Sequence, residues 1–259
     1  MVSAVLSAAE FPEESRINMF NKEEFDRKLK EYGNGLPEKY FDASDKLFII
    51  CSELEEKAKT FNLTAITDPE EVLKKHIVDC LYLAECIEKL GPKGKILDVG
   101  SGAGFPSLPT AAVLSDHSVT ALDSTSKKID YIKNTSEKMG VNGFNAVAAR
   151  AEQAASGEMR ESYDFVTARA VARLSVLAEL CVPFVKVGGY FVSMKGAAAQ
   201  EEVDEAANAV NKLGCKLVDI IPYTIADLPD KRFLVIYKKI SATNKMYPRN
   251  YSQISKKTL

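Results

Sequence analysis

The sequence predicts an α/β protein in which a doubly wound, mostly parallel sheet follows an N-terminal helical extension. From Lys95 onward, short apolar runs alternate with amphipathic segments, a pattern typical of a parallel sheet with helices on both faces. Before residue 92, the apolar residues have helical spacing instead. A glycine-rich loop follows the first apolar run, and the first strand-to-helix turn is where doubly wound sheets bind ligands.

Three helical segments are predicted in residues 1–92, which we assign to the N-terminal extension. The first covers residues 20–33, with apolar residues at helical spacing and a glycine at its end. The second covers residues 40–61 and keeps the same rhythm. The third, residues 67–91, begins with a capping residue, a proline and acids, and it ends at a glycine. A short hinge then leads to residues 93–240, which we assign to the ligand-binding domain.

The predicted strands of that domain are seven apolar runs. In chain order they read KILDVG, SVTALD, FNAVAA, YDFVTA, GYFVSMK, CKLVDIIPY and RFLVIYKK. Residues 241–259 form a basic C-terminal tail, because the chain from residue 238 onward contains six Lys or Arg residues and no acid. With Tyr247 and Tyr251 interleaved, this tail suits attraction to phosphates with base stacking, and the alternative is a solvated, disordered terminus.

The composition is that of a globular chain long enough for one large domain with an appendage. The 259 residues are 46% hydrophobic and 27% charged, and no apolar stretch is long enough to cross a bilayer. The five cysteines are scattered without C-x-x-C spacing, so neither a disulfide framework nor a zinc site is indicated. Because the N-terminus also lacks a basic leader region, we expect a cytoplasmic protein without a membrane partner.

The glycine loop favours a ligand without phosphates. Gly100, Gly102 and Gly104 allow backbone torsions forbidden to other residues and let a ligand lie against the main chain. A phosphate-binding P-loop would need Lys followed by Ser or Thr after the glycines, and that pair is missing. The dinucleotide fingerprint G-x-G-x-x-G would need a glycine where this chain has Phe105, so a nicotinamide-dependent oxidoreductase is disfavoured.

Acidic residues follow the second and third predicted strands. Asp123 lies about 20 residues after the loop, where a carboxylate can accept both ribose hydroxyls of a nucleoside. Ala151 and Glu152 stand beyond the third strand, where a backbone amide and a carboxylate can meet an adenine edge. These strand ends converge on one adenosine, which predicts an S-adenosylmethionine site. The alternative for either acid alone is a helix cap or a solvated loop residue.

Several longer motifs resemble one known family. DVGSGAGFPSLP, VTALDS, RAEQ, YDFVTARAVARLSVLAEL and GGYFVSMKG, together with the upstream FNLTAITDPEEVLKKHIVDCL, resemble the bacterial 16S ribosomal RNA guanine-N7 methyltransferases, also called glucose-inhibited division protein B or ribosomal RNA small subunit methyltransferase G. The likeness extends from about residue 15 to residue 250. The chain departs from the family pattern at Cys80, where a serine is usual, and after Tyr247-Pro248-Arg249, where a Gly/Pro-rich run is usual.

This resemblance implies a class I S-adenosylmethionine-dependent methyltransferase with a Rossmann-like fold. It implies S-adenosylmethionine as the methyl donor, N7 of guanine 527 in 16S ribosomal RNA as the acceptor, and the RNA or the small ribosomal subunit as the partner. It also implies cofactor contacts at Gly100, Phe105, Ala151, Glu152 and Arg169. Guanine N7 carries an in-plane lone pair without a proton, so no general base is required.

Basic residues near the strand ends are candidates for contacts with cofactor and RNA. We expect Arg169 to bind the methionine carboxylate, because a guanidinium suits a carboxylate, and the alternative is a surface ion pair. Arg173 and Lys195 are expected to face RNA phosphates at the cleft mouth, although a solvated strand end is open for Lys195. Arg249 in the tail is a further RNA candidate.

His76 has two open interpretations, as an RNA-facing residue or as a structural histidine. It shares one helix face with Asp79, but the chain has only two histidines, so we predict no metal site. Two other functions are also open for the whole chain. It could methylate another RNA, a protein or a small molecule, or it could be a non-catalytic RNA-binding module.

Overall fold

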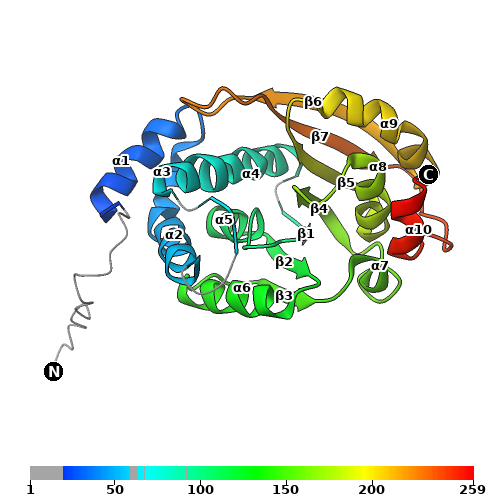
Figure 1. Cartoon of the computed structure of the whole chain (residues 1–259), viewed down its shortest axis with the longest axis horizontal. Coiled ribbons are helices and arrows are strands. Elements are labelled where there is room, and N and C mark those ends of the chain that lie inside the picture. The colour runs from blue at the N-terminus through cyan, green and yellow to red at the C-terminus, as the bar shows by residue number, and fades with distance from the viewer. Residues whose placement is uncertain (1–19, 59–62, 67, 92) are drawn as a thin grey trace.

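A seven-stranded sheet forms the centre of the computed structural model, which describes residues 20–58, 63–66, 68–91 and 93–259 (Figure 1). All seven predicted strands are present: β1 Lys95–Val99, β2 Ser118–Asp123, β3 Phe144–Ala148, β4 Tyr163–Arg169, β5 Val185–Lys195, β6 Cys215–Tyr223 and β7 Arg232–Lys239. Their order is β3-β2-β1-β4-β5-β7-β6. Strands β1 to β5 pair in parallel, and β7 lies antiparallel between β5 and β6.

The path of the chain across the sheet creates a crevice beside β1. From β1 the chain moves outward to β2 and β3, and it then returns to place β4 on the other side of β1. Open α/β sheets bind ligands outside the carboxyl ends of the strands at such a switch point. The predicted doubly wound, mostly parallel sheet is therefore confirmed, and its crevice lies next to the glycine loop.

Helices cover both faces of the sheet (Figure 1). On one face, the core joins the apolar sides of the helices before β3 to strand residues such as Ile96 and Phe165. On the other face, the helices after β3 pack on residues such as Leu97 and Val166. The helices are α1 Lys22–Tyr32, η2 Glu38–Ala43, α2 Ser44–Ala58, α3 Pro69–Val72, η3 Leu73–Val78, α4 Asp79–Leu90, α5 Ser107–Val113, α6 Ser126–Lys138, α7 Ala151–Ala154, α8 Leu174–Cys181, η4 Val182–Phe184, α9 Ala199–Lys212 and α10 Tyr251–Lys256.

The third predicted helical segment is a continuous helical path made of α3, η3 and α4. Asp68 caps its start, since its side chain accepts a hydrogen bond from the amide of Glu71 at 2.9 Å, and Pro69 occupies the first turn. Its end is at Gly91, as predicted. The middle turn, η3, is a π-helix, a rare geometry that often occurs at functional sites. This path shares one hydrophobic core with the sheet, so its polar residues are brought close to the ends of the strands.

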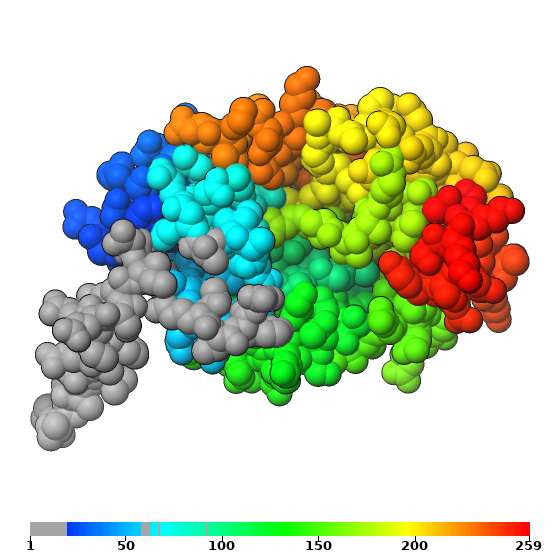
Figure 2. Space-filling model, in the orientation of Figure 1, coloured from blue at the N-terminus to red at the C-terminus, as the bar shows by residue number. Residues whose placement is uncertain are grey.

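The C-terminal tail is docked at one end of the molecule, where Figure 2 shows it in red beside the yellow residues of α9. Ile254 in α10 is fully buried against the core that contains α8 and α9. Arg249 binds the buried carboxylate of Glu179 in α8, with Nη2 to Oε2 at 2.6 Å. The alternative of a solvated, disordered terminus is therefore wrong. Within the part of the chain that the structure describes, no helix combines the length and the apolar character needed to span a membrane.

Candidate active site

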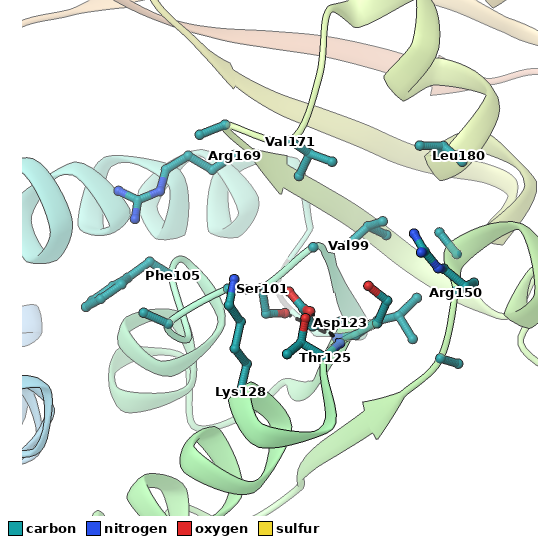
Figure 3. A pocket seen from close by; sticks show the side chains of 18 of the residues that line it. Val99, Ser101, Phe105, Asp123, Thr125, Lys128, Arg150, Arg169, Val171 and Leu180 are labelled. Atoms are coloured by element: carbon teal, nitrogen blue, oxygen red, sulfur yellow. Dashed lines mark hydrogen bonds between the residues drawn. The ribbon is translucent and has the colours of Figure 1, made fainter. Parts of the chain in front are cut away.

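Two neighbouring cavities lie at the carboxyl ends of the parallel strands. The first, of about 450 Å³, is lined by the glycine loop, the end of β2, the start of α7 and the residues after β4 (Figure 3). The second, of about 690 Å³, is lined by η3, the ends of β4 to β6 and the start of β7. Four residues line both cavities: His76, Arg169, Ala170 and Val171. Two ligands, one bound in each cavity, would therefore approach one another at this shared wall.

The glycine loop forms the floor of the first cavity. Gly100, Gly102 and Gly104 all have positive φ angles, of +76°, +57° and +88°, as their predicted role requires. A Cβ on Gly100 would lie 2.6 Å from Cγ2 of Val171, so only glycine fits there. The Ser101 hydroxyl donates to the carbonyl of Asp98 and accepts from the amide of Leu122, which fastens the loop to β1 and β2.

Asp123 stands at the end of β2 with its carboxylate held by two backbone amides. Its Oδ2 accepts from Gly102 at 3.0 Å, and its Oδ1 accepts from Thr125 at 2.8 Å. Each carboxylate oxygen can accept a second hydrogen bond, so both stay available to a ligand hydroxyl. Asp123 lines the first cavity. In Figure 3 it lies between Arg150 on one side and Phe105 and Arg169 on the other.

Ala151 and Glu152 begin α7 and line the same cavity. The amide of Ala149, just after β3, donates to the carbonyl of Asp123 at 3.0 Å, which holds the ends of β2 and β3 together. Tyr251 of α10 also lines this cavity. Sequence reasoning did not place Tyr251 in this cavity, because 99 positions separate it from Glu152 and only the docking of the tail brings the two together.

Asp98 is a buried carboxylate beneath the glycine loop that sequence reasoning missed. Its Oδ2 accepts from the amide of Ser107 at 3.1 Å, whereas Oδ1 is buried without a partner among the described residues. Burial raises the pKa of Asp98 to about 6. An acid inside the apolar run KILDV was the available signal, since a charge in a central strand needs a specific role.

Phe105 and His76 form a stacked pair at the shared wall, with ring centroids 4.6 Å apart. Burial, and then the charge of Arg169, lower the pKa of His76 to about 3, so its ring is neutral. Nδ1 of His76 lies 3.2 Å from Nη2 of Arg169 and 3.1 Å from the carbonyl oxygen of Lys75. Its Nε2 lies 3.1 Å from Oγ1 of Thr64. His76 is thus a buried and fully partnered ring, and its contact with RNA stays a prediction.

Asp79 is the centre of a buried ion cluster in the wall of the second cavity. Its Oδ2 binds Nη1 of Arg169 at 3.2 Å. Its Oδ1 accepts from the hydroxyl of Tyr223 at 2.7 Å and from Nη1 of Arg232 at 3.0 Å. Sequence reasoning placed Arg169 at the site but missed Tyr223 and Arg232, which follow it by more than 50 positions. Arg169 is not in a surface ion pair, and its contact with a cofactor carboxylate stays a prediction.

The other basic candidates occupy three different settings. Arg173 is exposed at the rim of the second cavity, where Nη2 binds Glu201 and Glu205, each at 2.7 Å. Lys195 is 9% exposed and binds the carboxylate of Glu202 at 2.7 Å, so it is not a solvated strand end. Arg249 lines neither cavity. Among the described residues, no three His, Cys, Asp or Glu side chains are grouped so that they could hold a metal ion.

Comparison with known proteins gives consistent matches along most of the chain. The family model for rRNA small subunit methyltransferase G matches residues 44–225. The chain is 40% identical over 241 residues to the ribosomal RNA small subunit methyltransferase G of Lactobacillus johnsonii, covering 92% of this chain and 100% of that protein. It is 44% identical over 199 residues to the protein of the same name from Clostridium novyi, covering 76% and 82%. Among solved structures, a SAM-dependent O-methyltransferase from Thermotoga maritima is similar with a TM-score of 0.49 and 14% identity, over 74% of this chain and 72% of that chain.

Proposed function

Because the chain belongs to the rRNA small subunit methyltransferase G family, we propose that it transfers a methyl group from S-adenosylmethionine to N7 of a guanine in 16S ribosomal RNA. The guanine is the one at position 527 that the motif resemblance implies. One observation carries the proposal: a cavity with the polar groups for a nucleoside adjoins a second cavity, and the two share a wall. A ribosomal RNA substrate would place the reaction in the cytoplasm.

The first cavity fits S-adenosylmethionine in the chemistry of its lining. Asp123 would accept the ribose hydroxyls, since its carboxylate is already aimed by two amides. Ala151 and Glu152 would meet the adenine edge. The methionine end would then lie near Phe105 and Arg169, on the side where the two cavities share a wall (Figure 3).

The chain's own residues have little bond chemistry to perform. When bound, S-adenosylmethionine supplies a sulfonium methyl group, whose carbon bonds to guanine N7 as the C–S bond breaks and its electron pair passes to sulfur. The walls of the two cavities would hold N7, the methyl carbon and sulfur in line, and such alignment is worth on the order of 7–11 kcal/mol. His76 is neutral and so adds no further positive charge to this wall, where the charge of the Arg169 guanidinium is paired with Asp79.

The test is to map the modified atom. Unmodified small-subunit RNA, from cells that lack the enzyme, is incubated with the purified chain and methyl-labelled donor. We expect label at N7 of one guanine, and no label when that guanine is replaced by 7-deazaguanine. Label on protein, on a small molecule or on another RNA would instead support the second candidate, a methyltransferase with a different acceptor.

A further inference from the structure

The second cavity contains one carboxylate that has acceptor capacity to spare. Glu202, in α9, lines this cavity with a side chain that is 14% exposed. Its Oε2 accepts from the amide of Leu174 and from Nζ of Lys195, each at 2.7 Å. Among the described residues, none donates to its Oε1, and this atom is not one of those buried without a partner. Glu202 is therefore held in place through one oxygen while the other remains available.

The two other acids that line the second cavity are less suited to bind a ligand. Asp79 already accepts from three side chains, two of them guanidinium groups, which leaves little free capacity. Asp230 is exposed, so water competes for its oxygens. Glu202 is thus the carboxylate that combines burial, fixed orientation and a free oxygen.

Lys195 fixes the position of that carboxylate. Its ammonium group binds the carbonyl of Ala172 at 2.8 Å as well as Oε2 of Glu202. Because Ala172 follows β4 and Lys195 ends β5, the two strand ends and α9 are joined at one point. We interpret Lys195 as a positioning residue for Glu202 rather than as a direct contact for an RNA phosphate.

Guanine has a donor edge that matches this arrangement. Its N1–H and N2–H groups lie side by side, on the opposite side of the purine from N7. N7 must point toward the first cavity, so the donor edge would point away from the shared wall. Glu202 lines only the second cavity, whereas His76 and Arg169 line both, so a guanine in the second cavity with N7 toward the shared wall could present its donor edge to Glu202.

The reaction itself strengthens such a contact. Methylation at N7 puts positive charge on the purine and makes N1–H more acidic, so a carboxylate at that edge binds the transition state more tightly than the substrate. Adenine presents an acceptor at N1 instead of a donor, and a carboxylate would repel it. We propose that Glu202 binds the N1–H and N2–H edge of the acceptor guanine and thereby selects guanine, an inference that rests on the proposed function.

The test combines a protein variant with a base analogue. Full-length wild type, Glu202→Gln and the matched control Asp204→Asn are compared on small-subunit RNA ligated with guanine or inosine at the methylated position. Inosine keeps N7, O6 and N1–H but lacks the 2-amino group. Asp204 is an exposed acid on the same helix, where it accepts from Gln200, and it does not line the cavity.

We expect Glu202→Gln to lower kcat/KM on guanine RNA by about 10- to 100-fold, the range for a hydrogen bond to a charged group. Replacing guanine by inosine should lower kcat/KM of the wild type about 10-fold. It should lower that of Glu202→Gln clearly less, since the variant no longer binds the N1–H and N2–H edge well. Asp204→Asn should match the wild type, and S-adenosylmethionine affinity by calorimetry should be equal in all three proteins.

Two results would overturn the role of Glu202 alone: wild-type rates for Glu202→Gln, or equal inosine costs in wild type and variant. If Glu202→Gln does not bind the cofactor, Glu202→Asp, which keeps the charge but shortens the side chain, enters the same comparison. Absence of any guanine methylation by the wild type, with cofactor binding intact, would instead reject the proposed function and this inference with it.

Discussion

The two cavities differ in the groups that make their walls. The first is built from backbone and from residues that directly follow β1, β2 and β3, with glycine torsions and amide hydrogen bonds doing most of the shaping. The second is built from charged side chains of distant segments, joined in pairs such as Asp79 with Arg169 and Lys195 with Glu202. A local chain pattern can therefore shape one ligand site while the neighbouring site depends on long-range ion pairs.

The largest expected effect is the loss of stability when Asp79, the centre of the ion cluster in the second cavity, is replaced. Asp79→Ala would leave two largely buried guanidinium groups, those of Arg169 and Arg232, without their anion, which costs about 3–5 kcal/mol of unfolding free energy. Asp123→Ala removes only two hydrogen bonds at a half-buried position, with an expected cost of about 1 kcal/mol. Denaturant unfolding measures both. Equal losses would contradict the distinction between the two cavities.

The next largest effect is on cofactor affinity, and here the first cavity should matter more than the second. Asp123→Ala should weaken S-adenosylmethionine binding by about 1–3 kcal/mol, because charge-assisted hydrogen bonds to ribose are lost. Calorimetric titration measures this affinity directly. Asp130→Ala is the control, since Asp130 is an exposed acid in α6 that does not line the cavity. Wild-type affinity in the Asp123 variant would remove that residue from the ribose site.

Another effect is expected from pH at the shared wall. Burial and Arg169 hold the pKa of His76 at about 3, below its ordinary value near 6.5, so the unfolded chain takes up the proton first. The contribution of neutral His76 to the unfolding free energy is therefore complete above about pH 6.5 and is lost as the pH falls toward about 3. Unfolding free energies measured between these limits should therefore fall less steeply for His76→Gln than for the wild type. Parallel curves would show that His76 does not stay neutral in the folded protein.

The smallest effect concerns the rim of the second cavity. Arg173→Ala should leave stability unchanged, because Arg173 is exposed, yet it should reduce the slope of log affinity for RNA against log salt by about 1 if it meets one phosphate. Arg27→Ala is the control, an equally exposed ion-paired arginine on α1 that lines neither cavity. Binding titrations at several salt concentrations measure the slope. An unchanged slope would show that Arg173 does not contact an RNA phosphate and serves only to link α8 to α9.

Much of the first cavity could be predicted from the sequence. The run KILDVG followed by glycines located β1 and the loop, and the alternating pattern gave all seven strands. Asp123 and Glu152 could be placed together because parallel strands end at one edge of a sheet. The class I methyltransferase fold is confirmed by the strand order and by the family match. Asp98 was missed although an acid within an apolar strand was a signal, because the burial of its carboxylate is known only from the structure.

The chain's local patterns were thus sufficient for the sheet, the loop and the acids that follow it, because hydrophobic periodicity and backbone torsion depend on near neighbours. The fold alone determined that Asp79, Arg169, Tyr223 and Arg232 form one cluster and that Tyr251 reaches the first cavity. No spacing rule links residues more than 50 positions apart. Their partners follow from how the helices and the antiparallel strands pack on the sheet, since a buried charge is stable only where that packing supplies its counter-charge.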